Sequence, residues 1–132
     1  MMKNINSKFF KDTFFIKDLK LSSIHLINNS KFPWIILIPN RKNIKNIHEL
    51  KKADQIQLIH EISYCSKVLK KIFKAKNINV EKIGNFVNRL HIHIIARSKK
   101  DTSWPLSVWV AKKKDYSYKE LNKIIIKLRQ HL

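Results

Sequence analysis

The sequence has few of the residues and segments that mark several classes of protein. One cysteine in 132 residues, Cys65, excludes an internal disulfide and is typical of a reducing cytoplasm. No segment approaches the roughly 20 consecutive apolar residues of a membrane span, and Met1 to Lys11 lacks the sustained apolar run of a targeting segment. No repeat, linker or low-complexity segment divides the chain. The length fits one domain, and we expect residues 1–132 to form it.

Acidic residues are also scarce. Nine acidic residues stand against 28 basic ones and give a net charge of +19, which would normally suggest a nucleic acid or a membrane surface as partner. However, the chain contains 24 Lys, 21 Ile and 12 Asn, all residues that adenine/thymine-rich codons specify, and its lysines are spread out. We therefore attribute most of the charge to composition. Such a field would still concentrate an anionic substrate.

The most informative stretch runs from Arg89 to Arg97, with the sequence Arg-Leu-His-Ile-His-Ile-Ile-Ala-Arg. Its alternation of polar and apolar residues predicts a half-buried strand, because successive strand side chains point to opposite faces. Leu90, Ile92 and Ile94 would line one face. Arg89, His91 and His93 would share the other face and point into one volume.

Three interpretations of the two histidines compete. The simplest is a polar strand face that meets water. A metal site is the second, but it needs further ligands, for which His25, His48 and His60 are the distant candidates. The third is nucleophilic catalysis at phosphorus, in which a neutral imidazole attacks while its neighbours stabilise the developing charge.

The sequence around these histidines resembles a known family. Gly84-Asn85-Phe86-Val87 precedes the strand, and Asp101-Thr102-Ser103-Trp104-Pro105 follows it. With Leu90 to Arg97, these residues resemble the histidine triad (HIT) superfamily of nucleotide-binding hydrolases and transferases, especially a bacterial branch with an incomplete triad. Phe32 to Pro39 and Ile47 to Leu50 are similar to that branch too, so the resemblance covers about residues 12 to 110.

The resemblance implies roles for particular residues. His91 matches the nucleophile, and His93 matches the histidine that contacts phosphate. Gly84 and Asn85 match a Gly-Gln pair beside the substrate phosphate. The sequence departs from the family at the first triad histidine, which is Arg89 here, and at a small hydroxyl residue, which is Phe86.

The implied reaction is attack of His91 on the α-phosphate of a nucleoside polyphosphate, dinucleoside polyphosphate or phosphoramidate. A covalent nucleotidyl-histidine would form and then be hydrolysed by water, with Arg89, His93 and Asn85 holding the phosphoryl oxygens. This scheme requires no metal and no cofactor. The family also implies a homodimer with an extended shared sheet. His48 lies near the position of a further histidine of the superfamily, although a solvated loop histidine is the simpler interpretation.

The remaining patterns predict an α+β fold with an antiparallel sheet of about five strands and two main helices. Residues 21–28 and 34–38 suggest a hairpin, with His25 on the outer face of an edge strand. Residues 54–76 are expected to form a helix capped by Asp54. Strands at 78–83 and 105–110 and a final helix capped by Ser117 and Glu120 complete the expected elements. The expected apolar stripe of the first helix contains Ile56, Ile59, Ile62, Cys65, Leu69, Ile72 and Phe73.

A second function from another class is consistent with the composition. A basic module that binds single-stranded nucleic acid would stack bases on exposed aromatic residues. Trp34, Trp104 and Trp109 are the candidates, but Trp34 falls in an expected buried strand. We therefore rank this alternative below nucleotide hydrolysis, with Trp104 and Trp109 interpreted first as packing residues.

Overall fold

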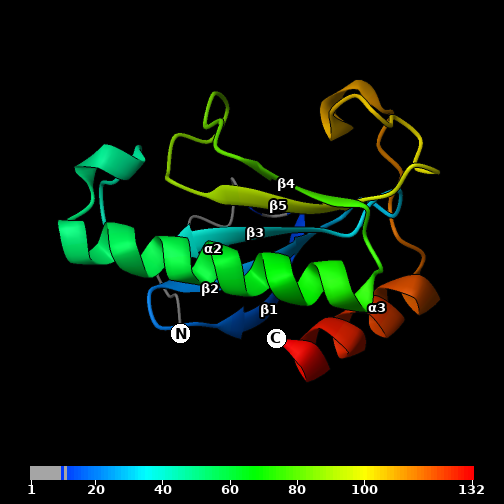
Figure 1. Cartoon of the computed structure of the whole chain (residues 1–132), viewed down its shortest axis with the longest axis horizontal. Coiled ribbons are helices and arrows are strands. Elements are labelled where there is room, and N and C mark those ends of the chain that lie inside the picture. Colours follow the sequence, from blue (N-terminus) through cyan, green and yellow to red (C-terminus); the bar gives the residue numbers. More distant parts are fainter. Residues whose placement is uncertain (1–9, 11) are drawn as a thin grey trace.

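The computed structural model describes residue 10 and residues 12–132. Within these residues, five strands form one antiparallel sheet in the order β1-β2-β3-β5-β4 (Figure 1). The strands are β1 (Thr13–Asp18), β2 (Ser22–Ile27), β3 (Trp34–Pro39), β4 (Asn77–Glu81) and β5 (Ile92–Arg97). The helices are η1 (Ile47–Glu49), α2 (Lys52–Ile72), η2 (Val108–Val110) and α3 (Tyr118–His131), of which η1 and η2 are short 3-10 turns.

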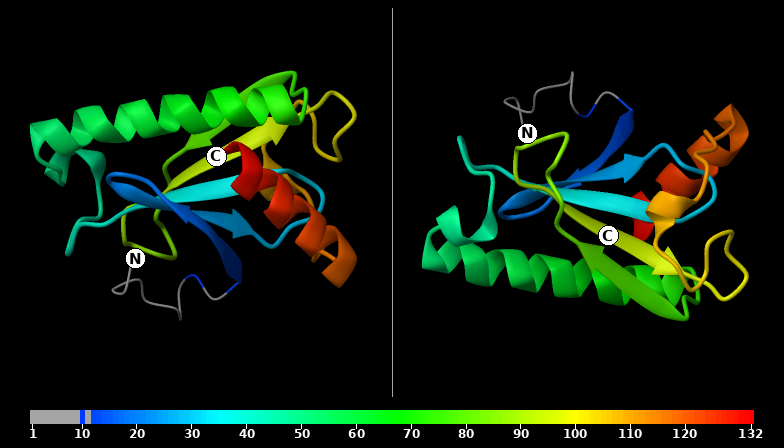
Figure 2. Two further views of the ribbon diagram at one scale, coloured as in Figure 1. Left: turned by 90° about the horizontal axis from the view of Figure 1, so that it is seen from below. Right: turned by 90° about the horizontal axis from the view of Figure 1, so that it is seen from above.

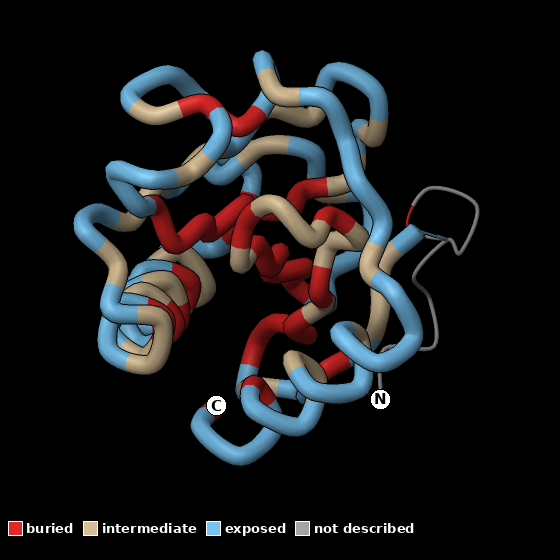
Figure 3. The backbone as a smooth tube through the Cα atoms, turned by 90° about the vertical axis from the view of Figure 1, so that its right-hand side faces the viewer, coloured by how far each residue is buried: buried red, intermediate tan, exposed pale blue. Residues whose placement is uncertain are grey.

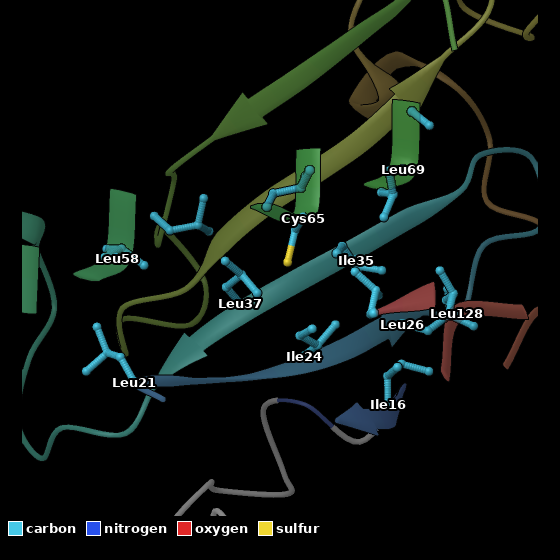
Figure 4. Packing of buried hydrophobic residues seen from close by; sticks show 14 of the residues in the cluster. Ile16, Leu21, Ile24, Leu26, Ile35, Leu37, Leu58, Cys65, Leu69 and Leu128 are labelled. Atoms are coloured by element: carbon cyan, nitrogen blue, oxygen red, sulfur yellow. The ribbon is translucent and has the colours of Figure 1, made fainter. Parts of the chain in front are cut away.

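Helices α2 and α3 cover the same face of the sheet (Figure 2). Between them and the strands lies the main hydrophobic core, to which α2 contributes Leu58, Cys65 and Leu69 and α3 contributes Leu128 (Figure 4). Ile35 and Ile94, from β3 and β5, point into this core. Alternation then directs their neighbours to the opposite face of the sheet. That face carries the candidate site.

The α+β fold class is confirmed, as are several of the expected elements. Strands β2 and β3 form the expected antiparallel hairpin, with Ile24 opposite Leu37, and every residue of β3 is buried. Helix α3 begins at a capping box in which Ser117 and Glu120 exchange side-chain and backbone hydrogen bonds. These elements follow local rules that the sequence carries directly.

Other expectations were wrong. Strand β1 was not anticipated, and its pairing with β2 makes β2 an interior strand, so His25 does not lie on an edge. Residues 105–110 form no strand, because the chain closes there into the turn η2. Strand β5 begins at Ile92 instead of Arg89, and residues 89–91 lead into it as an irregular segment.

Helix α2 presents most of the expected stripe to the core, because Cys65 and Leu69 are buried and Ile62, Ile72 and Phe73 pack against the same cluster. Its first turns differ from the expectation. It begins at Lys52, and Asp54 does not cap it but pairs with Arg41, with 2.7 Å between the carboxylate and Nε. Ile56 and Ile59 are exposed, whereas Leu58 and Glu61 are buried. The Glu61 carboxylate accepts hydrogen bonds from the backbone N–H groups of Leu21 and Ser22. A pattern of apolar residues does not identify a buried glutamate, so the expected stripe began at Ile56 and Ile59, which are exposed.

Burial is concentrated in the central strands, and the outer sides of both helices are exposed (Figure 3). At the far end of β5, the guanidinium of Arg97 is 2% exposed and forms a bidentate pair with Asp101 at 2.8 and 3.0 Å. Arg97 also donates to the carbonyl of Leu106. These bonds fix the segment 98–107 against the sheet. Within the described residues, no helix is both long and apolar enough to cross a membrane.

Candidate active site

A cavity of about 350 Å³ opens on the sheet face opposite α2 and α3. Trp34, Ile36 and His93 line it, and each alternates along its strand with a residue of the main core. The connection from β4 to β5 and the segment around η2 form the walls, through Gly84 to Val87 and through Val108 and Trp109. Most of the lining side chains are apolar. The cavity therefore offers an apolar compartment with two imidazoles at its base.

His91 lies immediately before β5 and is 7% exposed. Its Nδ1 lies 2.7 Å from the backbone carbonyl oxygen of Arg89. Because a carbonyl oxygen only accepts, Nδ1 must carry the proton and donate it. In the neutral ring this leaves an unprotonated Nε2 with its lone pair available. Phe10 packs edge-on against the ring at a centroid distance of 5.4 Å and helps to fix its orientation.

His93 has the opposite tautomer. The indole Nε1 of Trp34 lies 3.0 Å from His93 Nδ1. An indole nitrogen only donates, so His93 Nδ1 accepts and the proton of the neutral ring is on Nε2. The two rings are neighbours, with centroids 5.0 Å apart. The pair therefore combines a free imidazole lone pair on His91 with an imidazole N–H donor on His93.

The surroundings keep both rings neutral. Burial lowers the pKa of His91 below its ordinary value of 6.5, and the positive charge of Lys82 lowers it further, against the opposing effect of the Arg89 carbonyl. Burial and the neighbouring His91 lower the pKa of His93 to about 3. At neutral pH each ring is therefore uncharged and has the tautomer that the hydrogen bond at its Nδ1 requires.

The indole of Trp34 provides a direct test of the tautomer of His93. Trp34→Phe keeps an aromatic ring in the same place but removes the N–H, so His93 should become a mixture of tautomers in nitrogen NMR spectra. Loss of this one buried hydrogen bond should lower the free energy of unfolding by about 1 kcal/mol. Trp109→Phe is the matched control, because the indole of Trp109 donates to Glu81 and not to a histidine. An unchanged His93 spectrum in Trp34→Phe would contradict the assignment.

The only glycine of the chain lies at the wall of the cavity. Gly84 has a φ of +76°, a conformation that residues with a side chain rarely adopt. A Cβ at this position would lie 3.5 Å from Lys82 Nζ, an ordinary contact, so the requirement for glycine comes from the backbone angle. Asn85 follows and is exposed at the cavity. The structure thus brings Gly84, Asn85, His91 and His93 to one cavity.

Arg89 is the exception among the expected site residues. It precedes the first residue of β5, so strand alternation does not govern its direction. Instead of lining the cavity with the histidines, Arg89 lines a second cavity together with the segment 42–45 and Asn88. Its backbone carbonyl still contacts the site, because it accepts the hydrogen bond from His91 Nδ1. The expectation that the Arg89 side chain shares a face with His91 and His93 was therefore wrong.

Sequence reasoning interpreted Trp109 first as a packing residue and missed Glu81 and Lys82, and all three shape the site. Trp109 lies 5.3 Å from His93 and 4.9 Å from Trp34, measured between ring centroids, and its indole donates to Glu81 at 2.9 Å. Glu81 is opposite His93 in the register of β4 and β5. This pairing joins segments distant in sequence, so no local pattern could have indicated it. Lys82 was missed for the same reason.

The other histidines do not line the cavity. His48 is exposed in η1 and His60 is exposed on α2. His25 instead contacts the hydroxyls of Thr13 and Ser23 at 3.3 and 3.1 Å. Among residues 10 and 12–132, no group of three His, Cys, Asp or Glu side chains is arranged to hold a metal ion. The metal interpretation therefore lacks a third ligand in the described part of the chain.

The fold and site define a class of protein: an α+β domain in which paired histidines lie at the base of an apolar cavity. A family model, the HIT domain, matches residues 8–100, and the chain belongs to the HIT family. It is similar to a histidine triad protein from Bradyrhizobium japonicum, with 37% identity over 97% of this chain and 96% of that chain and a TM-score of 0.92.

Two further structures share the fold. A histidine triad protein from Marinobacter aquaeolei VT8 is 30% identical over 98% of this chain and 95% of that chain, with a TM-score of 0.93. The diadenosine triphosphate hydrolase of Plasmodium falciparum is 17% identical over 88% of this chain and 74% of that chain, with a TM-score of 0.67. No match was found among curated protein sequences.

Proposed function

We propose that this HIT protein binds a nucleotide and cleaves it at the α-phosphate through a covalent nucleotidyl-histidine. The observation that carries the proposal is the complementary pair of tautomers at the base of the cavity. His91 has an unprotonated Nε2, as a nucleophile requires, and His93 has an Nε2–H that can donate to a phosphoryl oxygen. A solvated polar strand would need neither arrangement.

In the first step, the lone pair of His91 Nε2 forms a bond to the α-phosphorus. The bond from phosphorus to the leaving group breaks, and the leaving group departs with that electron pair. The imidazole ring then carries a positive charge, which the hydrogen bond from Nδ1–H to the Arg89 carbonyl stabilises. In this proposal the Nε2–H of His93 and the amide of Asn85, which both line the cavity, bind the phosphoryl oxygens.

In the second step, a water oxygen attacks the same phosphorus. The bond between phosphorus and Nε2 breaks, its electrons return to the imidazole, and the proton of the water passes to solvent. The products are a nucleoside monophosphate and the original neutral His91. Every group needed for both steps is a side chain, a backbone group or water.

The apolar part of the cavity fits the nucleoside. Trp34 and Trp109 form an edge-to-face pair beside His93, and Ile36 and Val108 complete an apolar surface on which a base can pack. The net charge of +19 would attract the phosphates. The similar fold of a diadenosine triphosphate hydrolase supports dinucleoside polyphosphates as the first substrates to test.

We also propose that the chain acts as one domain, residues 1–132, in a homodimer, as the family resemblance implies, and in the cytoplasm, as its single cysteine suggests. The proposed chemistry needs no metal and no cofactor. Nucleic-acid binding is less well supported by the aromatic residues, because Trp34 and Trp109 line one cavity and Trp104 packs beside the guanidinium of Arg97, so the three form no extended stacking surface.

Trapping of the intermediate tests the proposed function. Incubation with diadenosine triphosphate followed by rapid denaturation should give a protein mass increased by one adenylate, with the modification on the peptide that contains His91. Hydrolysis without any covalent adenylate would contradict the proposed route. Absence of both hydrolysis and adenylate with dinucleoside polyphosphates and phosphoramidates would contradict the proposed function.

The pH dependence of the reaction provides a further test. Protonation of His91 would remove its lone pair, and the lowered pKa keeps the ring neutral at pH values where an ordinary histidine is charged. We therefore expect kcat/KM to stay constant on acidification through pH 6.5 and to fall only at lower pH. A steady-state pH profile on a substrate whose own phosphates do not titrate in this range checks the expectation. A midpoint at or above 6.5 would contradict it.

A further inference from the structure

The second cavity has a different chemical character from the first. It has a volume of about 300 Å³ and is lined by Lys42, Asn43, Ile44, Lys45, Asn88 and Arg89. Three of these six residues are cationic and none is acidic. Two chain segments form it, and they are joined where the N–H of Leu90 donates to the carbonyl of Ile44 at 2.9 Å. The cavity is therefore formed by two backbone segments that are hydrogen-bonded to each other, and not by exposed side chains alone.

A backbone turn lies between the two lysines that line this cavity. Asn43 has a φ of +59°, which asparagine tolerates better than most residues, and the chain turns there between Lys42 and Lys45. In the described part of the chain, no carboxylate is ion-paired with the ammonium group of Lys42 or Lys45. The neighbouring carboxylate of Glu49 instead accepts hydrogen bonds from the backbone N–H groups of Lys45 and Asn46. The positive charge of the lysines thus remains available for an anion.

Lys82 connects this cavity to the histidines. Its ammonium group donates to the side-chain oxygen of Asn46, directly after the segment that lines the second cavity. The same ammonium lies close to Gly84, at the wall of the first cavity, and its charge acts on His91. Arg89 makes the second connection, because its side chain lines one cavity while its carbonyl holds the His91 ring in the other.

We infer that the second cavity is a binding site for phosphate groups, held by Lys42, Lys45 and Arg89. The bound phosphates have one of two sources. They are either the phosphates that follow the attacked one in a nucleotide occupying the first cavity, or a separate inorganic phosphate chain. The inference deepens the proposed function, and only the first source rests on it. The chemistry is the same in both cases: ammonium groups and a guanidinium fork bind phosphate oxygens.

The experiment measures binding of tripolyphosphate by calorimetry to the full chain at about 0.15 M salt, where interactions between distant exposed charges are largely screened. We expect the double variant Lys42→Ala/Lys45→Ala to lose about tenfold or more in affinity, a change of at least about 1.4 kcal/mol. The single variant Arg89→Gln should also weaken binding. Circular dichroism would verify that each variant is folded.

The matched control is Lys119→Ala/Lys123→Ala, which removes the same charge from exposed positions on α3. It should bind tripolyphosphate as the parent does. Equal losses in the two double variants would show that the anion responds to the overall charge, and the inference would be overturned. Because this measurement needs no turnover, its result is independent of whether the proposed hydrolysis is correct.

A second measurement distinguishes the sources of the phosphates. If a nucleotide extends from the first cavity into the second, the parent should bind ATP more tightly than AMP, and Lys42→Ala/Lys45→Ala should reduce that preference. If the anion is separate, tripolyphosphate should bind equally well with and without saturating AMP. Either pattern supports the site, provided that the control variant does not reproduce it.

Discussion

Replacement of His91 by alanine should lower nucleotide turnover by about 10⁴-fold or more while the protein stays folded. Loss of an attacking residue has effects of this order, because the remaining groups bind substrate but cannot form the covalent intermediate. The ring of His91 forms a hydrogen bond to the preceding backbone and an edge contact with Phe10, so its removal should cost little stability beyond these contacts. Initial rates on diadenosine triphosphate and mass spectrometry for bound adenylate measure the effect.

The control for this experiment is His48→Ala. His48 is exposed and lies outside the cavity, so this variant removes a histidine of the same chain without affecting the proposed chemistry. It should retain the parental rate, and both variants should give the parental circular dichroism spectrum. Turnover by His91→Ala at a rate near that of the control would reject His91 as the nucleophile.

Replacement of Arg97 by methionine should produce the largest loss of stability, about 3 to 5 kcal/mol in the free energy of unfolding. Arg97 and Asp101 are both largely buried, and removal of the guanidinium would leave the carboxylate without its partner. Burial raises the pKa of Asp101, but hydrogen bonds from Arg97 and from the backbone N–H groups of Ser98 and Trp104 lower it to about 2. The carboxylate is therefore charged at neutral pH in the parent, and in the variant it keeps the backbone N–H donors of Ser98, Ser103 and Trp104 but loses its charged partner. Denaturant titration at pH 7 measures the loss.

The matched control is Arg41→Met, which breaks the exposed pair with Asp54. Exposed pairs contribute about 0.5 kcal/mol, so this variant should remain close to the parent. Hydrogen exchange should also distinguish the two, because Arg97 holds the segment 98–107 through the carbonyl of Leu106 and the hydroxyl of Ser103. A loss in Arg97→Met no larger than in the control would contradict the structural role of the buried pair.

The two largest effects concern opposite ends of one short segment. His91 precedes β5 and carries the proposed chemistry, whereas Arg97 is its last residue and organises the chain that follows. That chain includes η2 and Trp109, which packs against His93. The stability of the Arg97 cluster therefore contributes to the shape of the cavity. Arg97→Met should consequently weaken nucleotide binding as well as folding.

Local patterns in the sequence determined the secondary structure of most of the chain. The hairpin of β2 and β3, the final helix with its capping box and the direction of His93 follow from strand alternation, helix periodicity and side-chain hydrogen bonds between near neighbours. Gly84, the only glycine of the chain, has a positive φ, the conformation for which glycine is best suited. These features depend on residues within a few positions of each other, so a single sequence contains the information.

Only the tertiary structure decided the features that depend on contacts between distant segments. The tautomer of His93 depends on Trp34, 59 residues away, and the buried face of α2 depends on Glu61 accepting hydrogen bonds 39 and 40 residues away. The side chain of Arg89 lines a second cavity because strand β5 begins after it, where pairing with β3 starts. The sequence by itself determined which residue types are available for the chemistry. The fold decided their protonation, their direction and their neighbours, because hydrogen bonds and burial act through space.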